Sequence, residues 1–155
     1  MPLALRIVPV ILTYCLSVAT VIAGGPVSWS FAAVADAEGR SVIELSAMVE
    51  EGWHIYALEL PRDDGPLPTV VRIQPSGSFE LLEVNEPEPE EVMDPNFQMV
   101  VRYHSGSPVL RAVLMRKEGA AITVLGEVEF MACNDMTCLP PVSVPFEVEL
   151  PALKK

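Results

Sequence analysis

The stretch SVIELSAMV, residues 41–49, decides the fold class of this chain. Its residues form two alternating sets, of which one is Ile43, Leu45 and Ala47 and the other is Val42, Glu44 and Ser46. A period of two places each set on its own face of a β-strand, and the first set is entirely apolar. A strand with one apolar face has to pack against a second layer of structure. The stretch therefore predicts a half-buried strand in a layered β protein.

Similar short runs follow one another along the chain and are separated by residues typical of turns. They occupy residues 27–34, 41–49, 53–60, 69–74, 79–84, 98–104, 108–115, 121–133 and 142–150. The 15 prolines disfavour long helices, and 155 residues that are 50% hydrophobic suffice for one domain with its own core. We therefore expect an all-β, immunoglobulin-like two-sheet sandwich with eight or nine short strands.

The N-terminus has the pattern of a secretory signal peptide over residues 1–23. One basic residue, Arg6, precedes an apolar run that ends in small residues around Ala23. An uncleaved membrane anchor is the alternative, because the run is close to the shortest length that spans a bilayer. Cleavage would remove Cys15 and leave two cysteines in an exported, potentially oxidising compartment, which we expect to be the periplasm.

The charge is strongly acidic, with 21 Asp and Glu against 10 Lys and Arg and a net charge of −11. This balance excludes a nucleic-acid-binding surface. Six of the acids lie in residues 83–94, EVNEPEPEEVMD, where prolines alternate with glutamates. The composition predicts a solvated extended loop, and an acidic docking patch for a partner is the alternative.

Cys133 and Cys138 stand in the segment FMACNDMTCLPP, with four residues between them. Predicted strands precede and follow this segment, so the pair closes the end of a hairpin. Asn134 and Asp135 tolerate turn conformations, and a disulfide bond is sterically reasonable. As a staple it would constrain the unfolded chain by only about 2 kcal/mol. An exposed pair is also accessible to the thiolate of another protein, so redox exchange is a second interpretation.

A soft metal site is a third interpretation. Met131 and Met136 could join the cysteines around Cu(I), with His54 or His104 as a further ligand. Neither histidine has a spacing that ties it to the pair, and for each we expect a strand residue satisfied by a local hydrogen bond. We predict no metal site and no cofactor. No nucleophile elbow, phosphate-binding glycine loop or zinc motif is present in the sequence.

Three segments carry a family resemblance: EGWHIYALELPRDDGPLPT, DPNFQMVVRYH and VEFMACNDMTCLPP, in this order. They resemble the N-terminal periplasmic domain of DsbD-type thiol:disulfide interchange proteins, also described as a disulfide-bond corrector domain. The resemblance covers residues 26–150 and implies an immunoglobulin-like fold with a redox-active cysteine pair. It also implies a role as a carrier of electrons. The donor would be a thioredoxin-like domain or membrane thiol reductase acting in trans. The acceptor would be a periplasmic disulfide isomerase or a thioredoxin-like protein of cytochrome maturation.

The resemblance also implies roles for single residues. Cys138 would form the mixed disulfide with a partner, and Cys133 would resolve it. Phe97 matches the aromatic residue of a loop that shields the pair. His54 and Tyr56 match aromatic positions beside it, although a tyrosine is more usual than a histidine at the first. If the pair is redox-active, the chain is a component of a protein-disulfide reductase. We expect the chain to be a monomer. The alternative function is a binding or structural sandwich with an inert disulfide bridge.

Overall fold

The computed structural model describes residues 22–23, 25–35 and 40–153. The described chain is built from twelve antiparallel β-strands and contains no helix. The strands are β1 (Ile22–Ala23), β2 (Val27–Ala35), β3 (Arg40–Val49), β4 (His54–Tyr56), β5 (Val70–Ile73), β6 (Phe79–Asn85), β7 (Glu90–Asp94), β8 (Met99–His104), β9 (Val109–Arg116), β10 (Ile122–Phe130), β11 (Ala132–Cys133) and β12 (Val142–Leu150).

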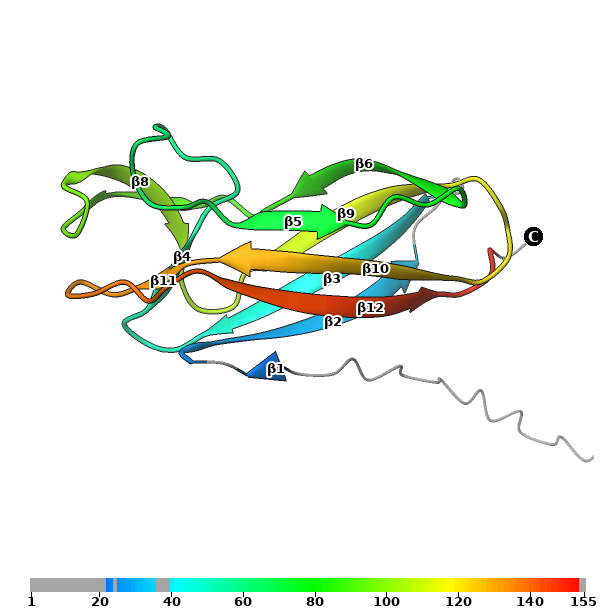
Figure 1. Cartoon of the computed structure of the whole chain (residues 1–155), viewed down its shortest axis with the longest axis horizontal. Coiled ribbons are helices and arrows are strands. Elements are labelled where there is room, and N and C mark those ends of the chain that lie inside the picture. Colours follow the sequence, from blue (N-terminus) through cyan, green and yellow to red (C-terminus); the bar gives the residue numbers. More distant parts are fainter. Residues whose placement is uncertain (1–21, 24, 36–39, 154–155) are drawn as a thin grey trace, which may run out of the picture.

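Two sheets face each other and enclose the main core. One has the order β1-β2-β3-β9-β6 and the other the order β12-β10-β5 (Figure 1). The alternation that opened the sequence holds in β3, where Ile43 and Leu45 are fully buried while Glu44 on the opposite face forms an ion pair with Arg111. Removing such apolar side chains from water is the main driving force for the packing of the two layers. The predicted sandwich is confirmed.

Aromatic side chains fill the centre of this core. Trp29 lies 5.6 Å from Phe130, and Phe31 lies 4.6 Å from Phe146, measured between ring centroids. Gly126 of β10 leaves room for one of these rings, because a Cβ atom at this position would lie 2.5 Å from Cζ of Phe146. Because Gly126 has no side chain, β10 and β12 pair along their whole length. This pairing sets the position at which the chain leaves the sandwich after β10.

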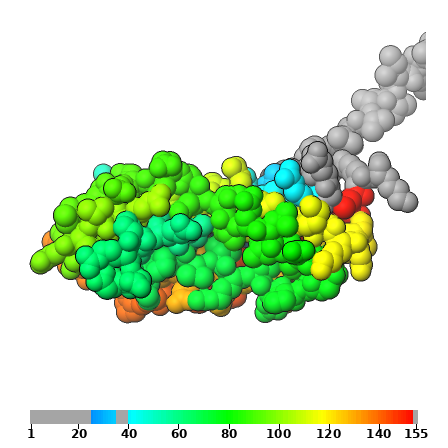
Figure 2. All heavy atoms as spheres, turned by 90° about the horizontal axis from the view of Figure 1, so that it is seen from above, coloured from blue at the N-terminus to red at the C-terminus, as the bar shows by residue number. Residues whose placement is uncertain are grey.

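A third sheet extends the sandwich at one end, with the order β11-β4-β8-β7 (Figure 1). It has a small apolar cluster of its own, whose buried members are Tyr56, Val101, Met131 and Cys133. In Figure 2 the chain after β4 and the β7–β8 hairpin lie side by side at this end of the molecule. Gly65 in that chain lies against the thioether of Met99 in β8. The four-stranded sheet therefore carries the second cluster away from the main core.

The structure differs from the sequence prediction in the number of strands. Strand β1 and strand β7 were not predicted, and the run at residues 121–133 divides into β10 and β11. The prediction of a solvated loop over residues 83–94 is wrong for residues 90–94, which form β7 and pair with β8 at the edge of the four-stranded sheet. Residues 83–84 lie in β6, as the predicted strand at residues 79–84 indicates, and β6 extends to Asn85. Glutamates suit an exposed edge strand because their charges oppose pairing with another chain.

The signal-peptide prediction falls almost entirely on residues outside the described ranges.

Candidate redox site

A disulfide bond joins Cys133, at the end of β11, to Cys138, and their Cα atoms are 4.1 Å apart. The two residues form an isolated antiparallel bridge. Strand β10 leads into this turn and β12 leads out of it, with Phe130 paired to Val142 at the last position of their ladder. The predicted hairpin closed by the cysteine pair is therefore present.

Backbone hydrogen bonds flank the disulfide on both sides. Inside the turn, the amide of Asn134 donates to the carbonyl of Thr137 at 2.9 Å. The Asn134 side-chain oxygen accepts from the amides of Met136 and Thr137, each at 2.9 Å, which is a typical Asx-type turn. Outside it, the amide of Leu139 donates to the carbonyl of Ala132 at 2.9 Å. The hairpin is thus held by its own backbone as well as by the disulfide.

The two cysteines differ in exposure. Cys133 is 0% exposed and belongs to the second apolar cluster, whereas Cys138 is half-buried at its border. Between them, Met136 projects into solvent with 88% of its surface exposed. A thiolate of another protein that approaches the hairpin therefore reaches Cys138 before Cys133.

A turn at residues 95–98, which we call the cap loop, connects β7 to β8 next to the cysteines. Asp94 organises it: one carboxylate oxygen accepts from the amides of Asn96 (2.8 Å) and Phe97 (3.1 Å), and its carbonyl accepts from the amide of Gln98 (2.8 Å). Gln98 has a φ of 54°, the left-handed conformation that closes the turn. The other carboxylate oxygen of Asp94 accepts from the buried Tyr56 hydroxyl at 2.7 Å.

The cap loop is connected to the cysteine hairpin by one polar contact and one apolar contact. The Asn96 side-chain amide donates to the carbonyl of Asn134 at 2.8 Å. Phe97 is half-buried, packs in the cluster that contains both cysteines and meets Tyr56 edge-on at 6.1 Å between ring centroids. The structure thus brings Phe97 and Tyr56, which the family resemblance indicated, to the cysteine pair.

His54 is also brought to the pair. It is the register partner of Cys133 between β4 and β11 and stacks on Tyr103 at 4.4 Å between ring centroids. Burial lowers the pKa of His54 below its ordinary value of 6.5, although the carboxylates of Asp94, Asp135 and Glu90 act in the opposite direction. Its imidazole is therefore neutral at pH 7.

Burial also raises the pKa of two tyrosines. For Tyr56 the hydrogen bond to Asp94 adds to the effect of burial, so the pKa lies far above its ordinary value of 10.0. For Tyr103 the carboxylate of Glu90 adds to the effect of burial. Both hydroxyls therefore remain protonated at neutral pH.

The two histidines have different surroundings. The Nε2 atom of His104 lies 2.9 Å from a carboxylate oxygen of Glu86, so the prediction of a locally satisfied histidine is confirmed there. For His54 it is wrong at Nε2, a buried atom that has no hydrogen-bond partner among the described residues. The nearest acid is Asp94, whose oxygen lies 3.8 Å away, beyond hydrogen-bond distance.

Three of the four sulfur ligands proposed for Cu(I), those of Met131, Cys133 and Cys138, lie together in the second cluster, and the fourth does not. Met131 is packed inside the second cluster while Met136 projects into solvent, and the cysteine sulfurs are bonded to each other. No group of three or more His, Cys, Asp or Glu side chains that could hold a metal ion occurs within the described ranges.

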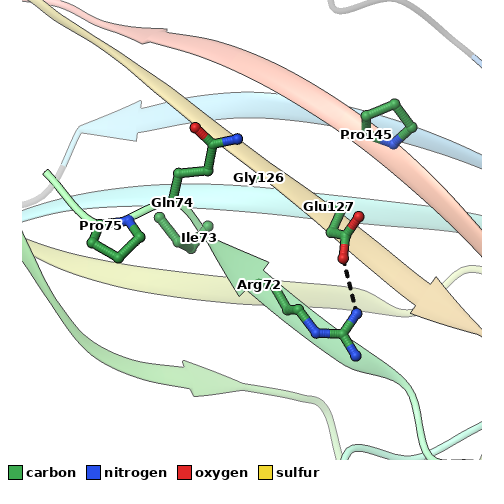
Figure 3. A pocket seen from close by; sticks show the side chains of 7 residues that line it. All are labelled: Arg72, Ile73, Gln74, Pro75, Gly126, Glu127 and Pro145. Carbon is green, nitrogen blue, oxygen red and sulfur yellow. Dashed lines mark hydrogen bonds and ion pairs between the residues drawn. The ribbon is translucent and has the colours of Figure 1, made fainter.

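A separate pocket of about 480 Å³ lies over the three-stranded sheet β12-β10-β5, outside the sheet that holds the cysteines (Figure 3). Its lining residues are Arg72, Ile73, Gln74, Pro75, Gly126, Glu127 and Pro145. The charged groups in it are Arg72 and Glu127, which form an ion pair at 2.9 Å, and Arg72 also pairs with Glu129 at 2.6 Å. This lining contains no thiol or histidine, so the pocket offers nothing to the chemistry of the cysteine pair.

The family described as "Thiol:disulfide interchange protein DsbD, N-terminal" matches residues 21–150. The chain belongs to this family. The family resemblance of the three sequence segments is thereby confirmed over essentially the whole described chain. No curated protein sequence matches the chain.

Two solved structures of DsbD-type N-terminal domains or their relatives are similar to this chain. The N-terminal periplasmic domain of ScsB from Proteus mirabilis has a TM-score of 0.64 at 14% identity and covers 88% of this chain, which in turn covers 52% of that domain. The N-terminal domain of Neisseria meningitidis DsbD in the reduced form has a TM-score of 0.54 at 15% identity, covering 80% of this chain and 86% of its own. At these identities the likeness shows the fold alone.

The family description names a thiol:disulfide interchange protein, and the ScsB domain is described as periplasmic. The cysteine pair of this chain lies at disulfide distance, as thiol–disulfide interchange requires. Within the part of the chain that the structure describes, no helix is long and apolar enough to cross a membrane.

We expect Phe97→Ala to speed the alkylation of the reduced cysteine pair. The ring packs against the cluster that contains both cysteines, so its removal opens the path of a small reagent such as iodoacetamide. The free energy of unfolding should change little, because Phe97 lies in a half-buried turn outside the main core. Alkylation rates followed by mass spectrometry would check this, with Phe79→Ala, a core aromatic far from the pair in sequence, as the variant in which stability falls instead. An unchanged rate would show that Phe97 does not shield the pair.

Asp94 and Asn96 are site residues that the sequence did not identify. The run Asp94-Pro95-Asn96 is itself a turn signal, and a buried aspartate that begins such a turn commonly accepts hydrogen bonds from the following amides. The contact between Asn96 and Asn134 had no signal, because it joins two turns that are 38 residues apart.

Proposed function

We propose that this chain is a periplasmic thiol–disulfide exchange protein that passes two electrons at a time through Cys133 and Cys138. Family membership and the unequal exposure of the two cysteine residues support the proposal. In the reduced protein the Cys138 thiolate attacks a partner disulfide, forms a mixed disulfide and releases one partner thiolate, which takes up a proton. Cys133 then attacks Cys138 and releases the second partner sulfur. The domain dithiol becomes a disulfide while the partner disulfide becomes a dithiol.

The proposal extends to the partners. The oxidised pair is re-reduced by a thioredoxin-like domain or a membrane thiol reductase acting in trans. The acceptor of the electrons is a periplasmic disulfide isomerase or a thioredoxin-like protein of cytochrome maturation. An export signal over residues 1–23 and a domain over residues 26–150 belong to the same proposal. The cap loop shields the pair until a partner displaces it, a role supported by the packing of Phe97 against the cluster that contains Cys133 and borders Cys138.

Equilibration in glutathione buffers tests this function. A carrier between thioredoxin-like donors and disulfide isomerases should have a reduction potential between about −270 and −180 mV, whereas structural disulfides lie below about −300 mV. After an acid quench, alkylation of free thiols and mass spectrometry, the protein should show one reversible transition in which both cysteines change together. The double variant Cys133→Ala, Cys138→Ala is the blank. A pair that stays oxidised throughout the glutathione range would establish the inert bridge and a passive sandwich.

A further inference from the structure

His54 is the one buried polar side chain beside the cysteine pair whose ring lacks a hydrogen bond at Nε2 within the described ranges. Its side chain is 10% exposed, so water does not readily replace a protein partner. An unsatisfied buried nitrogen is unfavourable for stability and calls for a physical explanation. His54 is directly opposite Cys133 in the register of β4 and β11. Cross-strand partners of this kind have their Cβ atoms about 5 Å apart on the same face of the sheet.

We infer that His54 accepts the proton of Cys133 when that thiol resolves the mixed disulfide, an inference that rests on the proposed exchange function. The proton of the Cys133 thiol moves to the imidazole, and the resulting thiolate attacks Cys138. The Cys133–Cys138 bond forms and the bond between Cys138 and the partner breaks. The leaving partner sulfur takes the electron pair and recovers the proton from the imidazolium, so no other reactant is needed.

The surroundings of His54 fit a transient proton acceptor. Cys133 is fully buried, so its proton has no direct path to water and a neighbouring base is required for rapid ionisation. The groups that face the imidazole are Cys133 on β11, Tyr56 on its own strand, Tyr103 on β8, Glu90 and Asp94 on β7, and Asp135 in the cysteine turn. The three acids stabilise the imidazolium once it forms, while burial keeps the resting ring neutral and ready to accept a proton.

Other candidate bases are less suitable. The carboxylate of Asp94 already accepts three hydrogen bonds, from the Tyr56 hydroxyl and two cap-loop amides, so its oxygens are occupied. Asp135 and Glu90 are exposed to solvent, whereas Cys133 is fully buried. The tyrosine hydroxyls remain protonated and cannot accept. The imidazole opposite Cys133 is thus the remaining candidate for the proton acceptor.

The test is a two-phase reaction of the reduced protein with the aromatic disulfide 5,5′-dithiobis(2-nitrobenzoic acid) in a stopped-flow spectrometer. Release of the first thionitrobenzoate reports the attack of Cys138, and its rate depends on the reagent concentration. Release of the second thionitrobenzoate reports resolution by Cys133, and its rate is independent of the reagent concentration. His54→Gln should slow the second phase by about tenfold or more at pH 7.5 and leave the first within about twofold.

The pH profile separates a proton acceptor from a structural residue. In the natural protein the second phase should fall below pH 6.5, as His54 becomes protonated, and level off above it. In His54→Gln it should keep rising through the pH range in which unperturbed cysteine thiols ionise, at about pH 8.5. His54→Tyr keeps an aromatic ring on Tyr103 and should behave like His54→Gln. The matched control is His104→Gln, a buried histidine paired with Glu86, which should retain the natural profile.

The outcomes distinguish the inference from the function on which it rests. Absence of a second phase in the natural protein would overturn the proposed exchange function itself. A second phase with the natural rate and pH profile in both His54 variants would overturn only the role of His54. Circular dichroism and disulfide formation establish that each variant is folded, and His54→Tyr replaces His54→Gln if the latter does not fold.

Discussion

Cys133→Ala is expected to accumulate a covalent, reducible adduct with a thioredoxin-like partner, and Cys138→Ala is expected to accumulate almost none. In the first variant the more exposed Cys138 can attack a partner disulfide, but no second thiol remains to release it. In the second variant the remaining cysteine is fully buried under the second apolar cluster and cannot reach a partner. The effect is close to all-or-none because resolution has no alternative nucleophile.

The measurement is made in cells that export the protein. Both variants are expressed in the exported compartment, thiols are quenched with acid, and adducts are compared on a non-reducing gel, with the double variant as the control. Equal trapping by the two variants would abolish the assignment of attacking and resolving sulfurs, and stronger trapping by Cys138→Ala would reverse it. No trapping by either, together with an equal loss of stability of about 2 kcal/mol, would identify the pair as a passive staple.

Asp94→Ala is expected to lower the free energy of unfolding by about 3 kcal/mol and to free the cap loop. The Asp94 side chain is 1% exposed and accepts three hydrogen bonds, and the Tyr56 hydroxyl would remain buried without a partner. An unsatisfied buried donor costs about 1–3 kcal/mol, and the two loop amides lose their acceptor as well. Urea unfolding would give the stability, and the alkylation rate of the reduced pair would report the cap loop.

Two further variants make the Asp94 result specific. Asp94→Asn keeps an oxygen for the cap-loop amides and should recover part of the stability and part of the protection from alkylation. Asp64→Ala removes an exposed aspartate whose ion pair with Arg62 is at the surface, and it should change neither quantity measurably. If Asp94→Ala unfolded at the same urea concentration as the natural protein, the hydrogen bonds of Asp94 would contribute nothing net.

The sandwich could be predicted from the sequence because period-two alternation reports directly which face of a strand is buried. Residues 41–49 show this, since the apolar set is the set that packs. Strand β7 could not be predicted in the same way, because it is an edge strand in which only Asp94 is fully buried. Glutamates and flanking prolines resemble a loop by composition, and only the partner strand β8 makes the segment a strand.

The site was predictable as far as it is local in sequence. Cys133 and Cys138 are close along the chain and flanked by two obvious strands, so their pairing followed from the hairpin. Phe97 came from family resemblance, because nothing in its own surroundings ties it to a cysteine. The unsatisfied Nε2 of His54 had no sequence signal, since it depends on which donors and acceptors three other strands bring near the ring and at what distance.

The hydrogen bonds that flank the disulfide concern more than the shape of the hairpin. They are made by backbone atoms, Asn134 to Thr137 on one side and Leu139 to Ala132 on the other, so they do not depend on the sulfur–sulfur bond. After reduction they would keep the two thiols facing each other at a high effective molarity, which for well-oriented groups reaches about 10⁵ M or more. A partner attached to Cys138 would then be expelled almost as soon as Cys133 ionises. Discrimination between partners therefore has to occur in the noncovalent encounter, before any sulfur is attacked.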